Sequence, residues 1–155
     1  MPVERLRQYL QDHHVKYVTI KHRPAFTAQE IAATAHLRGK ELAKAVVVKL
    51  DGTFAMAVLP APDKVSASRL KEATGAKEVE LASESEFGEL FPCCEVGAMP
   101  PFGNLWGMPV FVDCRLCEDE QIAFNAGSHT ELLRLSYADY ERLVKPTIAE
   151  LSTRN

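Results

Sequence analysis

The stretch KAVVVKLDGTFAMAVL, residues 44–59, predicts a β-hairpin. Two apolar runs flank Asp51-Gly52, a dipeptide that strongly indicates a two-residue turn between antiparallel strands. With this turn, Lys44 at the start of the first strand pairs with Leu59 at the end of the second. Side chains alternate between the two faces of a strand, and the bulkier face should pack against the core. That face carries Ala45, Val47, Lys49, Phe54, Met56 and Val58.

The opposite face of the hairpin carries a lysine at its end and two alanines. Ala55 and Ala57 leave volume beside Lys44, as is expected where a strand forms the floor of a pocket and presents an ammonium at its rim. The alternative is that Lys44 extends to solvent from a strand end and pairs with a carboxylate. From the residues alone, both interpretations stay open.

Helix and strand signals surround the hairpin. Pro2 suits the first turn of a helix, and apolar residues recur at helical spacing up to Leu10. Thr27 and Glu30 have the spacing of a capping box, so a second helix is expected there, ending before Gly39. The other expected elements are a strand over 17–20, helices that follow Ser66, Ser83 and Ser136, and strands over 110–113, 121–124 and 132–135. Strands interspersed with short helices predict a mixed α/β or α+β domain with a curved mixed sheet.

Length and composition predict one compact domain over residues 1–155. The chain is 46% hydrophobic and 25% charged, which is ordinary for a soluble globular protein. No apolar run approaches the roughly 20 residues of a membrane-spanning helix, so we expect a cytoplasmic location and no membrane partner. The net charge of -3 argues against the broad basic surface that binds duplex nucleic acid. We therefore expect no DNA partner, and only local contacts with any RNA.

Two glycine-containing loops carry candidate binding groups. In the loop Gly97-Ala98-Met99-Pro100-Pro101, the prolines stiffen the chain and leave backbone N–H donors at the first three residues. Such donors can hold a carbonyl oxygen as negative charge develops on it. A second loop, Gly127-Ser128-His129, follows a predicted strand and can bring His129 to a pocket. The ordinary interpretations are a surface turn for the first loop and a structural hydrogen bond for His129.

The four cysteines do not indicate a metal site or a redox centre. Cys93-Cys94 with Cys114 and Cys117 supply four thiols, but a vicinal pair makes a poor zinc knuckle. A bare Cys-x-x-Cys is also weak support for redox chemistry, and the acidic run 118–120 should raise the thiol pKa values. We expect no metal and no cofactor.

Four landmarks, in this order, resemble the YbaK/EbsC and prolyl-tRNA synthetase insertion-domain superfamily of aminoacyl-tRNA deacylases. They are His22 through Thr27-Ala28, Leu42-Ala43-Lys44, Gly97-x-x-Pro100-Pro101, and Ala126-Gly127-Ser128-His129. The similarity runs over nearly the whole chain, and the ordered set is more specific than its members, each of which is common alone. The resemblance implies a single YbaK-like editing domain, with a barrel-like mixed sheet surrounded by short helices.

The resemblance also implies a function, namely a freestanding factor that hydrolyses the ester between a small amino acid and the end of a mischarged tRNA. Such an ester is already activated, so the site needs positioning, a polarised carbonyl and attack by water or a tRNA hydroxyl. A cavity of limited size would exclude the larger, correct amino acid. Catalytic roles fall to Lys44, Gly97 and His129. Substrate contacts, the pocket alanines included, fall to His22, Ala55, Ala57, Ala98, Met99, Pro100, Gly127 and Ser128.

Two departures from the family pattern leave the edited amino acid open. Ser128-His129 is closer to the alanine-editing branch than to the cysteine-removing branch, yet Ala45 stands where the alanine-editing branch commonly has asparagine. Alanine, serine, threonine and cysteine all stay candidates. The expected partner is the acceptor end of a mischarged tRNA, and an aminoacyl-tRNA synthetase is a further candidate. The alternative function is a non-catalytic module that binds aminoacyl-tRNA or a synthetase.

Overall fold

The computed structural model of the chain describes residues 2–21, 42–61, 63–83, 85–86, 99–118, 120–125 and 130–153. Within them the helices are α1 (Pro2–Asp12), α3 (Ala67–Thr74) and α5 (Tyr137–Val144), with 3-10 helices η2 (Gly103–Trp106) and η3 (Leu116–Glu118). The strands are β1 (Tyr17–Lys21), β2 (Leu42–Leu50), β3 (Thr53–Pro60), β4 (Lys64–Val65), β5 (Val79–Leu81), β6 (Val110–Asp113), β7 (Gln121–Asn125), β8 (Glu131–Ser136), β9 (Thr147–Ala149) and β10 (Ser152–Thr153).

Strands β2 and β3 form the predicted hairpin. Lys44 pairs with Leu59, and the pairing continues in the predicted register to the turn. Asp51 and Gly52 have φ values of 51° and 84°, in the left-handed region that a type I′ turn requires. The turn residues therefore set the register, and this register decides which side chains share a face with Lys44.

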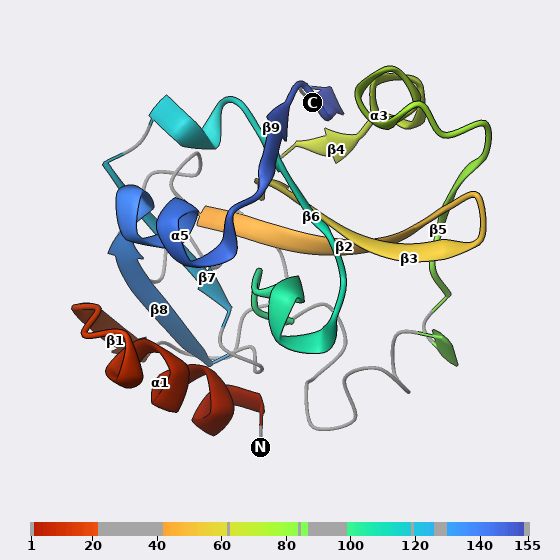
Figure 1. Cartoon of the computed structure of the whole chain (residues 1–155). Coiled ribbons are helices and arrows are strands. Elements are labelled where there is room, and N and C mark those ends of the chain that lie inside the picture. The colour runs from red at the N-terminus through yellow and green to blue at the C-terminus, as the bar shows by residue number, and fades with distance from the viewer. Residues whose placement is uncertain are drawn as a thin grey trace.

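The hairpin lies in the middle of a mixed sheet. The order is β1-β8-β7-β2-β3-β6-β9, with β5 also paired to β2, and β4 and β10 form a separate two-stranded sheet. Strands β2 and β7, β3 and β6, and β6 and β9 are parallel, and the other neighbours are antiparallel. Figure 1 shows β6 crossing the direction of β2 and β3, so the sheet is strongly curved, with short helices around it. The predicted α+β class with a curved mixed sheet is confirmed.

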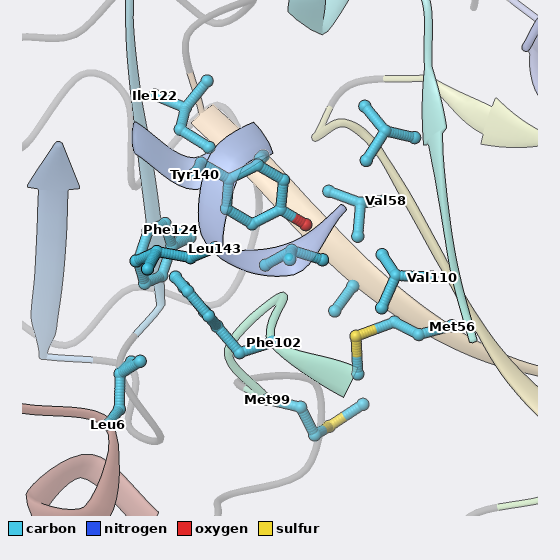
Figure 2. Packing of buried hydrophobic residues seen from close by; sticks show 14 of the residues in the cluster. Leu6, Met56, Val58, Met99, Phe102, Val110, Ile122, Phe124, Tyr140 and Leu143 are labelled. Carbon is cyan, nitrogen blue, oxygen red and sulfur yellow. The ribbon is translucent and has the colours of Figure 1, made fainter. Parts of the chain in front are cut away.

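The bulkier face of the hairpin packs into the main hydrophobic core, as predicted. Its buried members are Ala45, Val47, Met56 and Val58. Phe102 is fully buried in this core, with its ring centroid 5.5 Å from that of Phe124 and 5.3 Å from that of Tyr140 (Figure 2). The Tyr140 hydroxyl donates to the Pro101 carbonyl at 2.7 Å, so this buried polar group is satisfied.

The opposite face of the sheet, here called the outer face, carries Lys44 and two smaller apolar clusters. The Leu42 cluster consists of Leu42, Ala61, Ala123 and Leu132. The Leu70 cluster consists of Val48, Ala55, Ala57, Leu70 and Leu151, with further partly buried side chains around it. Leu42, Lys44 and Val48 have the same parity along β2, so both clusters lie on the face of the lysine.

Side-chain caps begin the helices where the sequence predicts them. The Ser66 hydroxyl oxygen lies 3.3 Å from the backbone nitrogen three residues ahead, and Ser136 caps α5 in the same way. Ser83 and Glu86 exchange the two hydrogen bonds of a capping box, at 3.0 and 3.3 Å. The helix expected after Thr27, and most of the helix expected after Ser83, fall outside the described residues. No described helix has the length and apolar character needed to cross a membrane.

Several short elements were not predicted, namely β4, β5, β9, β10, η2 and η3. Each has two to four residues, too few for a periodic pattern to develop. Helix η2 lies just after the first predicted loop. Gly103 begins it, and a Cβ atom there would lie 3.0 Å from Val110 Cγ2 and 3.1 Å from Met56 Cβ. The missing side chain therefore lets η2 pack closely on β3 and β6.

Candidate functional site

Lys44 lies on the outer face between the two apolar clusters. Leu42, two residues before it, belongs to the Leu42 cluster, and Val46, two residues after it, packs against the Leu70 cluster. The Lys44 side chain is partly exposed. Within the described part of the chain it forms no ion pair. The ammonium is thus partly buried, and no described carboxylate forms an ion pair with it.

Burial is the main influence on the charge of Lys44. Desolvation lowers the pKa of its ammonium below the usual lysine value, and the nearby Lys64 lowers it further. The carboxylate of Asp63 opposes both by raising that pKa. Burial prevails, so the cation is less stable here than on an exposed lysine and gains more from a polar or anionic ligand.

Strand β7 brings Asn125 to the outer face next to Lys44. Ala43 pairs in parallel with Phe124, so the next residues along the two strands are Lys44 and Asn125. On the other side, Asn125 pairs with Leu132 of the Leu42 cluster, which fixes the face of its side chain. Asn125 is 8% exposed, and its Oδ1 has no hydrogen-bond partner among the described residues. Sequence reasoning missed this residue.

A second cationic side chain, Arg134 on β8, shares the outer face. It pairs across the strands with Ala123 of the Leu42 cluster. Its Nε atom is buried and has no hydrogen-bond partner within the described ranges. Lys44 and Arg134 therefore flank the Leu42 cluster, and together they favour a ligand rich in oxygen atoms.

The turn after β3 places a buried carboxylate at the same end of the hairpin as Lys44. The Ala61 N–H donates to the Leu42 carbonyl at 2.7 Å, so the chain leaving β3 stays beside the start of β2. Asp63 follows in this turn and is only 4% exposed. It lies near enough to act on the Lys44 charge.

Asp63 belongs to a buried polar network. Arg115 forms an ion pair with its carboxylate. The Ser152 hydroxyl lies 3.4 Å from Asp63 Oδ2 and donates to Asp113 Oδ2 at 2.7 Å. Asp113 also accepts from the backbone N–H groups of Leu151 and Ser152, at 3.0 and 2.9 Å. These bonds tie strand β10 to β6 and to the turn beside Lys44, and we call Asp63, Arg115, Ser152 and Asp113 the Asp63 network.

A hollow of about 430 Å³ lies beside this network. Its lining residues are Arg69, Asp113, Cys114, Arg115, Glu118, Glu150, Ser152 and Thr153. The lining contains two arginines and three carboxylates, so its opposite charges largely offset each other. Neither Lys44 nor a residue of the two predicted loops contributes to it, and we place the candidate site at Lys44 instead.

The two alanines predicted to border the pocket lie in the Leu70 cluster. Ala55 and Ala57 are fully buried on the outer face, as members of the Leu70 cluster. Leu70 of α3 and Leu151 near the C-terminus cover them, so the volume that their small side chains leave is filled by hydrophobic groups. The small alanine side chains therefore make room for α3, and their role in substrate binding stays a prediction.

Part of the first predicted loop is described. Met99, Pro100 and Pro101 are buried, and the Met99 side chain packs into the main core near Phe102 (Figure 2). Its side chain therefore does not line a site on the outer face, and only its backbone N–H stays a candidate donor. The bond from Tyr140 to Pro101 anchors this end of the loop.

Most of the other predicted site residues fall outside the described ranges. They are His22, Gly97, Ala98, Gly127, Ser128 and His129. Asn125 is the last described residue before the second loop, and it stands beside Lys44. The roles of the six residues stay predictions.

The described cysteines have unreactive surroundings. Burial raises the pKa of both thiols, and nearby carboxylates, with Asp113 among them, raise both further. The pKa values shift in the predicted direction, but the causes are burial and other carboxylates rather than the acidic run 118–120. Cys117 Sγ lies 3.1 Å from the Tyr137 hydroxyl. Within the described ranges, no group of three or more His, Cys, Asp and Glu side chains is placed to hold a metal ion, and Cys93 and Cys94 lie outside them.

Comparison with solved structures agrees with this fold. The hypothetical protein APE2540 superposes with a TM-score of 0.86 at 22% identity, over 96% of this chain and 99% of that chain. A candidate trans-editing enzyme for prolyl-tRNA synthetase superposes with a TM-score of 0.84 at 19% identity, over 98% and 97%. At these identities the likeness shows the fold alone.

Sequence comparison is more specific. The chain is 35% identical over 124 residues to the multifunctional Ser/Thr-tRNA deacylase ProXp-y of Escherichia coli strain K12, covering 75% of this chain and 74% of that protein. It is 29% identical over 85 residues to a proline–tRNA ligase of Bacillus mycoides strain KBAB4, of which it spans only 15%. The profile of the aminoacyl-tRNA editing domain matches residues 22–143. By this match and the 35% identity, the chain belongs to the aminoacyl-tRNA editing domain family.

Proposed function

We propose that this protein is a freestanding deacylase that hydrolyses the ester bond of tRNA mischarged with serine or threonine. Membership of the editing-domain family supports the enzyme class and a tRNA substrate. The relative at 35% identity is named a Ser/Thr-tRNA deacylase, which favours these two amino acids over alanine and cysteine. The observation that carries the proposal is the half-buried Lys44, unpaired among the described residues and set beside Asn125.

Hydrolysis of an aminoacyl ester requires little of the protein beyond positioning the substrate. An aminoacyl ester is activated, and a cation placed at a substrate oxygen stabilises the charge that develops during attack. Lys44 supplies this cation from a rigid strand, and Arg134 adds a second positive group on the same face. The nucleophile is water or a hydroxyl of the tRNA, so the site needs no protein nucleophile.

The two predicted loops complete the proposed site. Backbone N–H groups at Gly97, Ala98 and Met99 are assigned to the substrate carbonyl. The loop from Gly127 to His129 is assigned to positioning the aminoacyl end. Two facts favour these assignments: the first loop is anchored in the core by the Tyr140 bond to Pro101, and the second begins two residues after Asn125.

A panel of mischarged tRNAs tests this function. We expect rapid ester loss from seryl- and threonyl-tRNA and slower loss from alanyl- and cysteinyl-tRNA, each measured against the rate without protein. Tight binding of all four without ester loss would contradict the enzyme and favour a non-catalytic module. A dependence of the rate on added synthetase would show whether a synthetase is a partner.

A further inference from the structure

The side chain of Asn125 combines deep burial with an unused hydrogen-bond acceptor. Its Oδ1 has no hydrogen-bond partner among the described residues, and this oxygen is shielded from solvent. A buried polar group without a partner costs stability, so proteins rarely keep one without a use. This amide therefore has the character of a ligand-binding group rather than of a structural one.

The position of Asn125 directs its side chain to the candidate site. It is the last residue of β7, and its backbone is engaged in the ladder with β8. Lys44 occupies the neighbouring position on β2, on the same face. A ligand that reaches the Lys44 ammonium therefore passes within reach of this amide oxygen.

The surrounding charges select the kind of donor that suits the oxygen. Lys44 and Arg134 are both cationic and share the outer face with Asn125, so a second ammonium from a ligand is disfavoured there. The nearby carboxylate of Asp63 already forms an ion pair with Arg115 and accepts a hydrogen bond from Ser152. A neutral hydroxyl is the donor that fits a neutral acceptor beside two cations.

We infer that Asn125 is a specificity-determining residue whose side-chain oxygen accepts a hydrogen bond from the hydroxyl of a seryl or threonyl group. This inference rests on the proposed deacylase function and names the side-chain atom that recognises the amino acid of the substrate. A site built to bind a hydroxyl rejects an analogue that lacks it, because the buried acceptor is then left unpaired. Alanyl-tRNA is that analogue.

Asn125→Leu tests the inference by removing the acceptor while keeping a similar side-chain size. We expect kcat/KM to fall about tenfold for seryl- and threonyl-tRNA and to change little for alanyl-tRNA. Asn125→Asp keeps an oxygen acceptor and should retain most of the preference for serine over alanine. An equal loss on all three tRNAs, or an unchanged ratio in the leucine variant, would overturn the inference.

Thermal unfolding supplies a readout that does not depend on activity. Since Asn125→Leu removes an unsatisfied buried group, we expect Tm to rise, by about 2–4 °C for a chain of this size. A clear fall in Tm would show that the amide has a structural role and would overturn the inference. The Tm measurement tests the inference even if wild-type protein hydrolyses none of the four tRNAs. Such a lack of hydrolysis would count against the proposed function instead.

Asn104→Leu is the matched control. Asn104 also has a buried side-chain oxygen without a partner among the described residues, but it lies in η2, which packs against the main core. Its replacement should leave the ratio of seryl to alanyl hydrolysis at the wild-type value. A ratio that falls equally in both variants would refute a specific role for Asn125.

Discussion

Arg115 forms an ion pair with Asp63, the carboxylate that acts most strongly on the charge of Lys44. The pair is largely buried, and Ser152 supports it from strand β10. Because Arg115 holds the carboxylate, Asp63 stabilises the Lys44 cation from nearby without forming an ion pair with it. A closer pair would cover the ammonium that the substrate needs.

This arrangement predicts opposite pH shifts for two variants. Lys44 must be protonated to act, so activity should fall as pH rises through its pKa, which burial lowers below the usual lysine value. Asp63→Asn removes the charge that raises this pKa, and the alkaline limb of kcat/KM should move to lower pH. Arg115→Gln releases the carboxylate toward Lys44, and the limb should move to higher pH. Both limbs are measured on seryl-tRNA after subtraction of spontaneous hydrolysis.

Asp12→Asn is the control for these shifts. Asp12 is an exposed residue of α1. The Asp12→Asn substitution removes a carboxylate charge, as Asp63→Asn does, but at a position that does not act on the Lys44 charge. It should leave the alkaline limb unmoved. If Asp63→Asn and Arg115→Gln shift the limb in the same direction, the electrostatic role of the Asp63 network is wrong.

The filled outer face predicts a large stability cost for Leu70→Ala. Leu70 is fully buried against Ala55 and Ala57, so its truncation leaves a cavity and should lower the free energy of unfolding by about 2–5 kcal/mol. Urea unfolding measures the change. Val18→Ala, at a side chain that is 50% exposed, should cost well under about 1 kcal/mol. A small cost at Leu70 would contradict the tight packing over Ala55 and Ala57 and would favour an open pocket beside them.

Burial of the thiols predicts that the cysteines take no part in the reaction. Their raised pKa values leave less thiolate at neutral pH, so alkylation of Cys114 and Cys117 should be slower than that of an exposed thiol. Replacement of both by serine should leave the deacylation rate within about twofold, since the proposed reaction uses no protein nucleophile. A large rate loss in a folded double variant would revive a thiol mechanism.

The sequence predicts the hairpin, its register and the capped helices because local chemistry decides them. Asp51-Gly52 strongly favours a two-residue hairpin turn, and the alternating side chains identify the core face. The short strands β4 and β10 escape prediction because their pairing depends on Asp113 and Ser152, which are distant in the chain. The same limit explains the alanines, whose empty volume is filled by Leu70 and Leu151.

In the candidate site, too, local features could be predicted from the sequence, whereas features that depend on long-range strand pairing could not. Lys44 is predictable from strand parity and from the resemblance. Asn125 and Arg134 join it through the parallel pairing of β2 with β7 and the antiparallel pairing of β7 with β8. The sequence shows a predicted strand followed by Asn125, two residues before Gly127, but it does not show that this strand pairs with β2.

The central claim is that the Lys44 ammonium drives hydrolysis of an aminoacyl ester, and single-turnover deacylation of seryl-tRNA by Lys44→Met tests it most directly. Wild-type protein should release serine well above the spontaneous rate, whereas the variant should fold, bind the tRNA and lose about a hundredfold or more in rate. Lys44→Arg, which keeps the charge, should recover part of it. Wild-type rates in a folded Lys44→Met protein would contradict the account.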